Sequence, residues 1–307
     1  AAGGPGAARL DERVTIVLVT SPVASNPSTE LIDRVIASFE LAEGLPACPL
    51  VLVADGVTVH PGRPRWNKGR VDEAALQRYR EYLEALRRKY ASTPGGGLPG
   101  RAAGSGARLV GPLELRMNFG LALLAGIEQV ETEFVIVVQH DRMFVEGFSL
   151  ADVIGLFDTH PDKLRYVGFS TVPDYPLRAA SKYGKWTRCS RPTGPGPGLT
   201  PLFMWYDSTH VCRTRPYEDL IRREVRRGEF VESSWGNRLL KEIQGCAEVW
   251  DYDYHMEHFG CFLYEDPVVG LGPAMVRHVS GRSFCSTEER LRRGWPPEQP
   301  SFPPEPA

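Results

Sequence analysis

The sequence predicts an α/β protein whose central sheet is mainly parallel and flanked by helices. Three observations predict this class: short apolar, β-branched segments typical of buried strands, amphipathic segments with helical spacing between them, and polar residues directly after the predicted strands. Strands that alternate with helices favour parallel pairing, because each helix returns the chain to the start of the next strand.

The first predicted unit is a strand, a helix and a second strand. Residues 13–20 (RVTIVLVT) are nearly all apolar and β-branched, which is typical of a strand buried on both faces. Apolar residues at helical spacing predict an amphipathic helix over 28–42, and the segment 49–54 (PLVLVA) predicts the second strand. Strands joined in this way are expected to be parallel neighbours.

The alternation continues to about residue 170. A long charged helix is predicted over 71–90, and the segment after it, STPGGGLPGRAAGSGA, has the composition of an exposed loop. Residues 108–110 then predict a strand, 121–130 a helix, and 133–138 (EFVIVV) a further buried strand. These elements complete the expected α/β pattern.

The pattern changes after Ser170. An aromatic stretch rich in Pro and Gly follows, which is typical of a binding loop or lid. Helices are predicted over 216–227 and 233–244, followed by the strand-like segment AEVWDYD. The last dozen residues, PPEQPSFPPEPA, have a composition that predicts disorder.

Composition and charge exclude some classes of partner. A net charge of -2 and a pI near 6.4 give no general field that attracts nucleic acid, so no nucleic-acid partner is expected. No apolar run reaches about 18 residues, so no membrane span is predicted. Because the first residue is not Met, localisation stays open: the Golgi or secretory lumen if an upstream anchor was removed, and otherwise the cytoplasm.

The cysteines predict no metal centre. The chain has 6 of them, widely scattered and without the CxxC spacing of zinc or redox sites. Disulfides and free buried thiols remain equally open.

Polar residues follow three of the predicted strands. The first strand ends at Thr20, Ser21 and Pro22, the second at Asp55 and Gly56. The central strand ends at the tripeptide Gln139-His140-Asp141. Because open α/β sheets bind ligands beyond the carboxyl ends of their strands, we expect these residues to line one site.

The order of these strand ends resembles that of the GT-A glycosyltransferases, particularly the family-2-like group, over residues 14–283. The resemblance implies the GT-A (nucleotide-diphospho-sugar transferase) fold and a hexosyl- or pentosyltransferase. Such an enzyme moves a sugar from a nucleotide-sugar donor, here expected to be a UDP-sugar, to a hydroxyl on a glycan, protein or small-molecule acceptor.

The resemblance also implies donor contacts. In that family the loop after the first strand holds the nucleotide, which makes Thr20, Ser21 and Pro22 candidate donor-binding residues. In the family, an acid after the second strand contacts the nucleotide base of the donor. Here that position is Asp55, beside Gly56. A simple turn after the strand is the alternative for this pair.

A divalent metal, Mn²⁺ or Mg²⁺, is the implied cofactor. In the family a later apolar strand ends in DxD, whose last carboxylate binds the metal; that position is Asp141, while Gln139 replaces the first Asp and His140 lies between them as a second donor-side candidate. One carboxylate suffices where phosphate oxygens and water complete the coordination. GT-A enzymes often add a C-terminal His ligand, and His278 in RHVSGR matches it in chain order.

Two further segments carry the resemblance. RMNFGLALLAG resembles the helix start that runs beside the donor, so Arg116 and Asn118 are candidate donor-binding residues; Asn118 also suits a helix N-cap. FVESSWGNRLL resembles the acidic motif that supplies the catalytic base of inverting enzymes, with Ser233 in place of its second acid. Glu232 is therefore the candidate base, and a helix-terminal acid is its alternative role.

The resemblance divides the chain into parts. Residues 1–290 are expected to form a single GT-A-like catalytic domain, with a nucleotide-sugar-binding half over 12–170 and an acceptor-side half over 171–290. Residues 291–307 form a Pro-rich tail.

Two groups of residues have open interpretations. Aromatic residues after Ser170 suit either an acceptor surface or core packing: Tyr175, Tyr183, Trp186, Trp205 and Tyr206. In WDYDYHMEHF, alternation would place four side chains on one strand face, as a second metal site, an acceptor surface or a solvated edge: Asp251, Asp253, His255 and Glu257.

Two other functions compete with sugar transfer. One is a non-catalytic nucleotide-sugar or glycan-binding protein on the same fold, favoured by the departures at Gln139 and Ser233. The other is a nucleotidyltransferase, which normally has a Gly-rich phosphate loop with Lys or Arg after the first strand; TSPVASNPSTE has neither.

Overall fold

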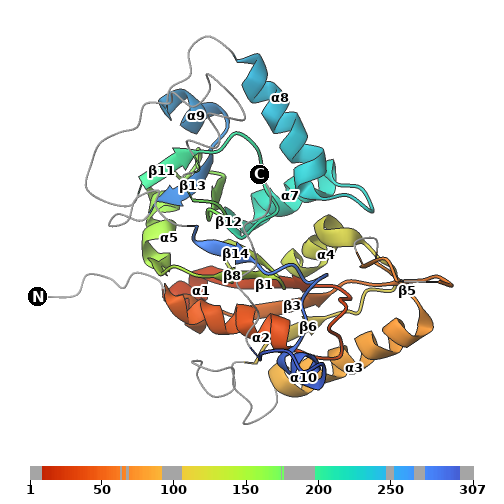
Figure 1. Ribbon diagram of the computed structural model, residues 1–307. Coiled ribbons are helices and arrows are strands. Elements are labelled where there is room, and N and C mark those ends of the chain that lie inside the picture. The colour runs from red at the N-terminus through yellow and green to blue at the C-terminus, as the bar shows by residue number, and fades with distance from the viewer. Residues whose placement is uncertain are drawn as a thin grey trace, which may run out of the picture.

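The computed structural model describes residues 9–62, 64–66, 69–91, 106–173, 175, 198–246, 252–265 and 274–297. Their centre is an eight-stranded sheet with helices on both faces (Figure 1). The sheet contains strands from both expected halves of the chain. This architecture confirms the predicted α/β class.

The strand pairings show that the sheet is mainly parallel. From one edge to the other it runs β11 (Gly198–Pro201), β13 (Cys261–Glu265), β10 (Tyr166–Gly168), β12 (His210–Arg213), β7 (Phe134–Gln139), β1 (Val14–Thr20), β3 (Leu50–Ala54) and β6 (Arg108–Val110). The strands β7, β1, β3 and β6 are parallel neighbours, as are β10 and β13. Strand β12 is antiparallel to β7 and β10, and β11 is antiparallel to β13.

Each face of the sheet has its own core. Even-numbered residues of β1, such as Ile16 and Leu18, pack with α2 (Glu30–Ala37), α3 (Glu73–Tyr90) and α5 (Leu150–Thr159). Odd-numbered residues of β1, such as Val17, pack with three helices on the other face: α4 (Asn118–Ile127), α7 (Thr214–Glu224) and α8 (Asn237–Gly245). Burial on both sides explains the nearly continuous apolar run of this strand.

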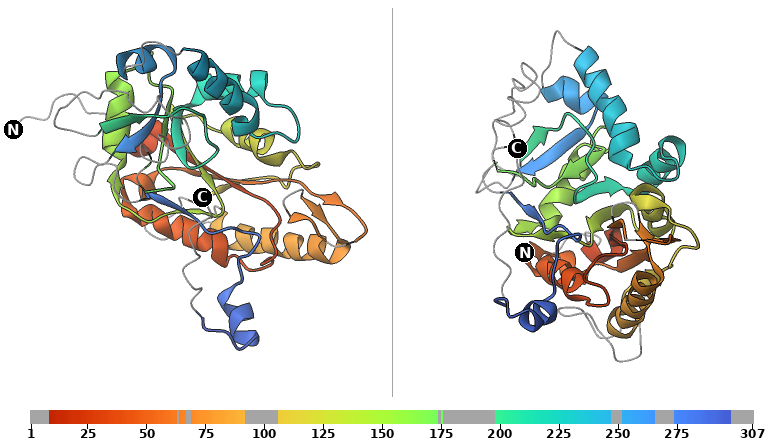
Figure 2. Two further views of the ribbon diagram at one scale, coloured as in Figure 1. Left: turned by 45° about the horizontal axis from the view of Figure 1, so that its top comes forward. Right: turned by 45° about the vertical axis from the view of Figure 1, so that its right-hand side comes forward.

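Shorter elements complete the fold. Three two-stranded sheets pair β14 (Val276–His278) with β8 (Arg142–Phe144), β2 (Ala42–Glu43) with β9 (Phe148–Ser149), and β4 (Thr58–Val59) with β5 (Arg70–Val71). Short helices in the described ranges include α1 (Leu10–Arg13), α9 (Tyr252–His258), α10 (Thr287–Arg292), and the 3-10 turns Ser38–Leu41 and Leu45–Ala47. Late in the chain, the first residue of α10, Thr287, donates to Glu30 at the start of α2, and α10 projects from the rest of the fold (Figure 2, left).

Most predicted elements of the first half are confirmed, with shifted ends. The helix expected over 28–42 is α-helical only to Ala37 and then continues as a 3-10 turn. The helix expected over 121–130 begins earlier, at Asn118. The segment predicted as a loop falls largely on residues 92–105, outside the described ranges.

The strand-like prediction for AEVWDYD is wrong where the structure describes it. Residues 247–251 lie outside the described ranges, and Tyr252–His258 forms helix α9. The side chains of Asp253, His255 and Glu257 therefore do not alternate along one face of a strand. His255 is buried and bonds to the carbonyl of Cys261, whereas Glu257 pairs with Lys163 at the surface, so the two do not share a site.

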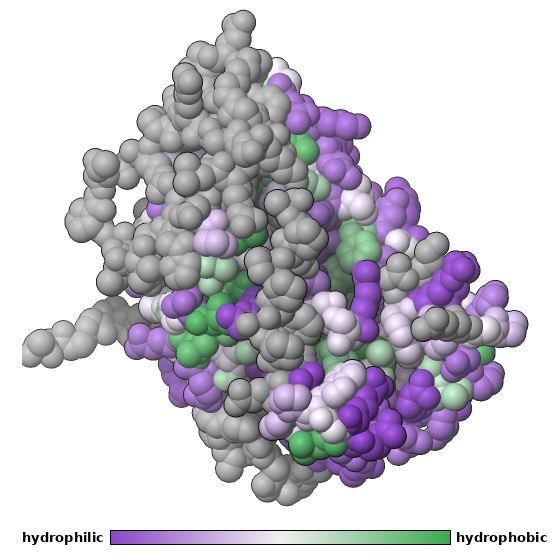
Figure 3. Space-filling view, viewed as in Figure 1, coloured by the Kyte–Doolittle hydropathy of each residue, from purple (hydrophilic) through white to green (hydrophobic). Residues whose placement is uncertain are grey.

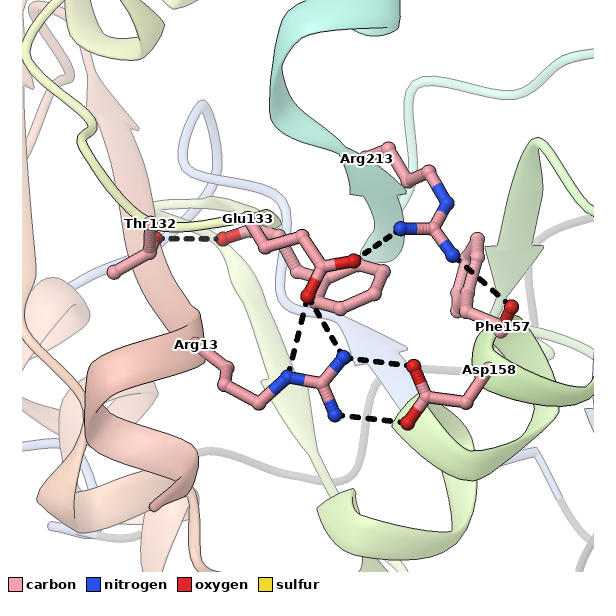
Figure 4. A network of polar contacts seen from close by, with 7 residues as sticks. Arg13, Thr132, Glu133, Phe157, Asp158 and Arg213 are labelled. Carbon is pink, nitrogen blue, oxygen red and sulfur yellow. Dashed lines mark hydrogen bonds and ion pairs between the residues drawn. The ribbon is translucent and has the colours of Figure 1, made fainter. Parts of the chain in front are cut away.

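A network of ion pairs lies at the amino ends of β1 and β7, at the edge of the sheet opposite the cavity-forming strand ends (Figure 4). Arg13 donates to Glu133 and to Asp158 with shortest distances of 2.7 Å to each, and Arg213 also pairs with Glu133. The network connects the starts of β1 and β7 to α5 and to the end of β12. It fixes the central strands at the edge opposite the candidate site.

The surface over α3 is mostly hydrophilic (Figure 3), which agrees with the charged helix that the sequence predicts. Among the described residues, no helix combines the length and the apolar character needed to cross a bilayer.

Candidate active site

A cavity of about 990 Å³ lies at the carboxyl ends of β1, β3 and β7. Every predicted site residue lines it: Thr20, Ser21, Pro22, Asp55, Gly56, Arg116, Asn118, Gln139, His140, Asp141, Glu232 and His278. The rule that parallel strands bind ligands beyond their carboxyl ends therefore locates this cavity correctly.

Asp141 and His278 are in direct contact. His278 Nε2 lies 3.2 Å from Asp141 Oδ2, because β14 pairs with β8 directly after Asp141 and places residue 278 opposite Arg142. The Gly281 N–H also donates to Asp141 Oδ2, at 3.1 Å. A Cβ at position 281 would lie 2.9 Å from Val23 Cγ1, so glycine lets this loop close onto the carboxylate.

Asp141 is held in its charged form. Burial alone would raise the pKa of its carboxyl, but the hydrogen bond from His278, the nearby imidazoles and the Gly281 N–H outweigh burial and hold it well below its usual range. A half-buried carboxylate that stays charged and borders a cavity is a suitable partner for a cation.

The donor set fits a divalent metal completed by ligands from outside the protein. Among the described residues, no group of three or more His, Cys, Asp and Glu side chains is arranged to hold a metal. Asp141 and His278 offer one carboxylate and one imidazole, and Mn²⁺ or Mg²⁺ in phosphate sites commonly takes one or two carboxylates with phosphate oxygens and water.

His140 shapes the loop after β1. The Ser21 N–H donates to His140 Nδ1 at 3.1 Å, and Thr20 Oγ1 lies 2.9 Å from the same nitrogen. Burial lowers the pKa of His140, so the ring is neutral and Nδ1 can accept these bonds. The imidazole therefore fixes the position of the loop that was expected to hold the nucleotide.

Asp55 stabilises the start of α4 from a distant strand end. Its Oδ1 accepts the N–H of Met117 at 2.8 Å and its Oδ2 accepts that of Asn118 at 3.1 Å, while Gly56 donates to Oδ1. Burial raises the pKa of Asp55, and the N–H donors with the charge of Arg116 offset part of that rise. Asp55 is therefore a helix cap supplied by another segment, not a simple turn residue.

Asn118 is not the N-cap that its sequence position suggests. It is the first residue of α4, with a left-handed φ of 68°, which Asn tolerates better than most residues. Its Nδ2 donates to the carbonyl of Gly228 at 2.6 Å, and Arg227 Nε donates to the carbonyl of Arg116 at 3.1 Å. The segment 116–118 thus connects Asp55 to the loop that precedes Glu232.

Glu232 begins a π-helical turn, Glu232–Gly236, that leads into α8. Its Oε2 accepts the backbone N–H of Asp207 at 3.3 Å, and its own N–H donates to Asp207 Oδ1 at 3.2 Å. π-Helical turns are rare and frequent at functional sites. The structure therefore couples the candidate base to an acid that the sequence did not single out.

Sequence reasoning missed several residues that line the cavity: Trp66, Arg142, Asp207, Phe230 and Arg282. Phe230 is 41% exposed and stacks on Phe119. Asp207 lies in WYDSTH, which contains no recognisable motif, so no sequence signal identified it. Arg142 had a signal, since it directly follows the predicted strand end Gln139-His140-Asp141, whereas Trp66 lies far from any predicted strand end.

The aromatic residues expected at an acceptor surface are divided. Trp205 is 3% exposed and packs in the core, so the core interpretation holds for it. Tyr175 and Tyr206 line the cavity. Tyr183 and Trp186 lie outside the described residues.

Comparison with known proteins gives similar folds at low similarity. No protein-family model and no curated protein sequence matches the chain. Among solved structures, the TarS fragment 1–349 from S. aureus is 15% identical with a TM-score of 0.34, covering 67% of this chain and 48% of that one. The same fragment in complex with UDP-GlcNAc is 15% identical with a TM-score of 0.35, and the match covers 67% of this chain and 47% of that one.

A second similar structure is the mannosyltransferase PcManGT from Pyrobaculum calidifontis, in complex with GDP-Man and Mn²⁺. It is 11% identical with a TM-score of 0.41, covering 82% of this chain and 56% of that one. This chain thus spans about half the length of these structures. Because these TM-scores are low, the description of the fold and the cavity rests on the structure of this chain alone.

Proposed function

We propose that this protein is a metal-dependent glycosyltransferase of the GT-A type, which transfers a sugar from a nucleotide-sugar donor to a hydroxyl acceptor. One observation carries the proposal: the Asp141–His278 pair, the loops after β1 and β3, and Glu232 all line one cavity. These are the parts that such a transfer requires, namely a cation site, a nucleotide site and a base.

The donor occupies the side of the cavity formed by the strand ends. Asp141 and His278 would hold Mn²⁺ or Mg²⁺ together with the donor diphosphate; such an ion, when bound, neutralises charge that develops on the leaving group. Thr20, Ser21 and Pro22 face the nucleotide, and Arg116 adds positive charge near it. A UDP-sugar is our first expectation for the donor.

Glu232 is the base of an inverting transfer. Glu232 lines the cavity, and its carboxylate takes the proton of the acceptor hydroxyl as that oxygen attacks the sugar carbon. The anomeric configuration of the product tests this assignment, since a retained configuration would remove Glu232 from the role.

A panel of donors tests the function. The protein is incubated with UDP-Glc, UDP-GlcNAc, UDP-Gal or GDP-Man, with Mn²⁺ or with EDTA, and the nucleoside diphosphate released as the sugar passes to water or to a sugar acceptor is measured. We expect release from one donor class that EDTA abolishes. Binding without turnover would favour the non-catalytic sugar-nucleotide binder, and neither binding nor turnover would refute the proposal.

A further inference from the structure

Asp207 connects the central strand to the candidate base. Gln139 Nε2, at the end of β7, donates to the carbonyl oxygen of Asp207 at 2.6 Å. Asp207 in turn exchanges two hydrogen bonds with Glu232: its N–H donates to Glu232 Oε2, and its Oδ1 accepts the Glu232 N–H. The side chain and the backbone of Glu232 are therefore both held by one residue.

The carboxyl group of Asp207 is unusually placed. The residue is 4% exposed, and its Oδ2 is buried without a hydrogen-bond partner among the described residues. A buried ionised oxygen without a partner is costly, so this group is more stable in the protonated form. Burial, and then the charge of Glu232, raise the pKa of Asp207 well above its usual range.

In the part of the chain that the structure describes, the titratable groups that interact electrostatically with Asp207 lie on three elements. Glu232 faces it from the π-helical turn, Tyr166 from β10 and Tyr217 from α7. Burial raises the pKa of both tyrosines, so their hydroxyls stay neutral and Glu232 contributes the charge. Glu232 is thus the group whose ionisation Asp207 senses.

The same geometry explains why Gln stands at position 139. Its amide donates to a backbone carbonyl, which a carboxylate cannot do because an ionised carboxylate only accepts. An Asp at 139 would also be one methylene shorter and would direct negative charge toward the carbonyl of Asp207. The departure from DxD is therefore compatible with a contact on the acceptor side.

We propose that Asp207 is a positioning residue for Glu232 and that Gln139 holds Asp207 in place, so that Gln139 serves the acceptor side of the cavity and not the donor. The proposal rests on the assignment of Glu232 as the base. It gives Gln139 a role different from the donor contact that its place in the chain suggests.

Substitution of Asp207 tests the positioning role. Asp207→Ala removes the acceptor for the Glu232 N–H, so kcat for the active donor should fall about 10-fold or more while the donor KM stays within twofold. Asp207→Asn keeps an oxygen at that place and should restore kcat to within about threefold of wild type. Loss of stability alone would leave kcat per folded molecule unchanged, and that result would overturn the proposal.

A titration independent of the reaction covers the case in which Asp207→Ala does not fold. Carboxyl ¹³C NMR follows Asp207 in the wild type and in Glu232→Gln. Removing the neighbouring charge should lower the pKa of Asp207 by at least about one unit. An unmoved pKa overturns the proposal. A shift in a protein that turns over no nucleotide sugar would leave this contact standing and refute the proposed function alone.

Gln139→Met tests which side of the cavity Gln139 serves. The variant keeps the length but cannot donate, so turnover should fall about 10-fold while affinity for the nucleoside diphosphate with Mn²⁺ stays within twofold. Gln77→Met on the exposed face of α3 is the matched control. A loss of nucleotide affinity with normal turnover of bound donor would show that Gln139 contacts the donor. That result would overturn the assignment of Gln139 to the acceptor side.

Discussion

Two acids of the same cavity, the half-buried Asp141 and the buried Asp207, have pKa values shifted in opposite directions. Burial raises the pKa of both. At Asp141 the hydrogen bond from His278, the imidazoles and the Gly281 N–H reverse that effect, whereas at Asp207 the charge of Glu232 adds to it and backbone N–H donors offset only part. Partners, not depth, therefore decide which acid is charged.

The contrast separates the cavity into two sides. The side with Asp141 keeps a negative charge that suits a cation, and a bound cation would in turn attract a diphosphate. The side with Asp207 favours a neutral acid beside Glu232, so that one carboxylate there is free to accept a proton. Acid groups whose environments move their pKa values apart are typical of acid–base sites.

The largest effect that tests this division is expected for Glu232→Gln. The variant keeps size and much of the helix-terminal polarity but removes basicity, so transfer should slow by about 10² to 10⁴-fold while donor and metal binding survive. Glu242→Gln, on the exposed part of α8, is the matched control and should behave as wild type. Near-normal turnover of Glu232→Gln would remove Glu232 as base.

A smaller effect is expected at Asp55, which acts on stability. Asp55→Ala removes the acceptor for the N–H groups of Met117 and Asn118 at the start of α4 and for that of Gly56, so the unfolding free energy should fall by about 2 kcal/mol. Asp72→Ala removes the cap of α3, whose Oδ1 accepts from Ala75, and should cost about 1 kcal/mol.

Urea unfolding measures both variants, and affinity for UDP with Mn²⁺ distinguishes them. We expect that affinity to fall only for Asp55→Ala, because Asp55 also orders Arg116 and Asn118 at the cavity. Equal UDP affinity in the two variants would show that Asp55 does not contribute to the nucleotide site.

The amino edge of the sheet provides a contrast with the carboxyl edge. Arg13→Met breaks the network with Glu133 and Asp158, and since Arg13 is partly exposed the loss should be about 1 kcal/mol. Nucleotide affinity should not change. Arg9→Met, at a pair whose Arg is 74% exposed, should cost less. A loss of nucleotide affinity in Arg13→Met would show that the two edges are not independent.

The smallest expected effect is a pH dependence of stability at Asp207. A carboxyl whose folded-state pKa is raised stabilises the fold fully below its unfolded pKa, near the ordinary value of 3.8, and loses this contribution as the pH rises toward the folded pKa. The stability of Asp207→Asn relative to wild type should therefore increase with pH above about 4. Urea unfolding at several pH values tests this, and parallel curves would contradict the raised pKa.

The sequence predicts the first half of the fold well because strands buried on both faces leave long apolar runs, as in β1 and β7. It also predicts the strand-end residues, because one geometric rule for parallel sheets places them together. The contact between Asp141 and His278, 137 positions apart, could be expected only from the resemblance.

Other features depend on contacts that no local pattern encodes. Asp55 caps α4 from 62 positions away, so the local candidate for the cap, Asn118, was wrong and nothing near the helix pointed to Asp55. Asp207 is coupled to Glu232 across 25 positions and lies in no motif. The segment over Tyr252–His258 misled because its alternating acids and aromatics suit a strand as well as a helix.

The central claim is that Asp141 and His278 form a cation site for a nucleoside diphosphate. Calorimetric titration of UDP and GDP into the wild type, with and without Mn²⁺, tests it directly beside Asp141→Asn and the exposed control Asp219→Asn. We predict that Mn²⁺ tightens binding of one nucleotide at least about 10-fold in the wild type and in the control, and that Asp141→Asn abolishes this dependence. Equal Mn²⁺ dependence in folded Asp141→Asn would contradict the account.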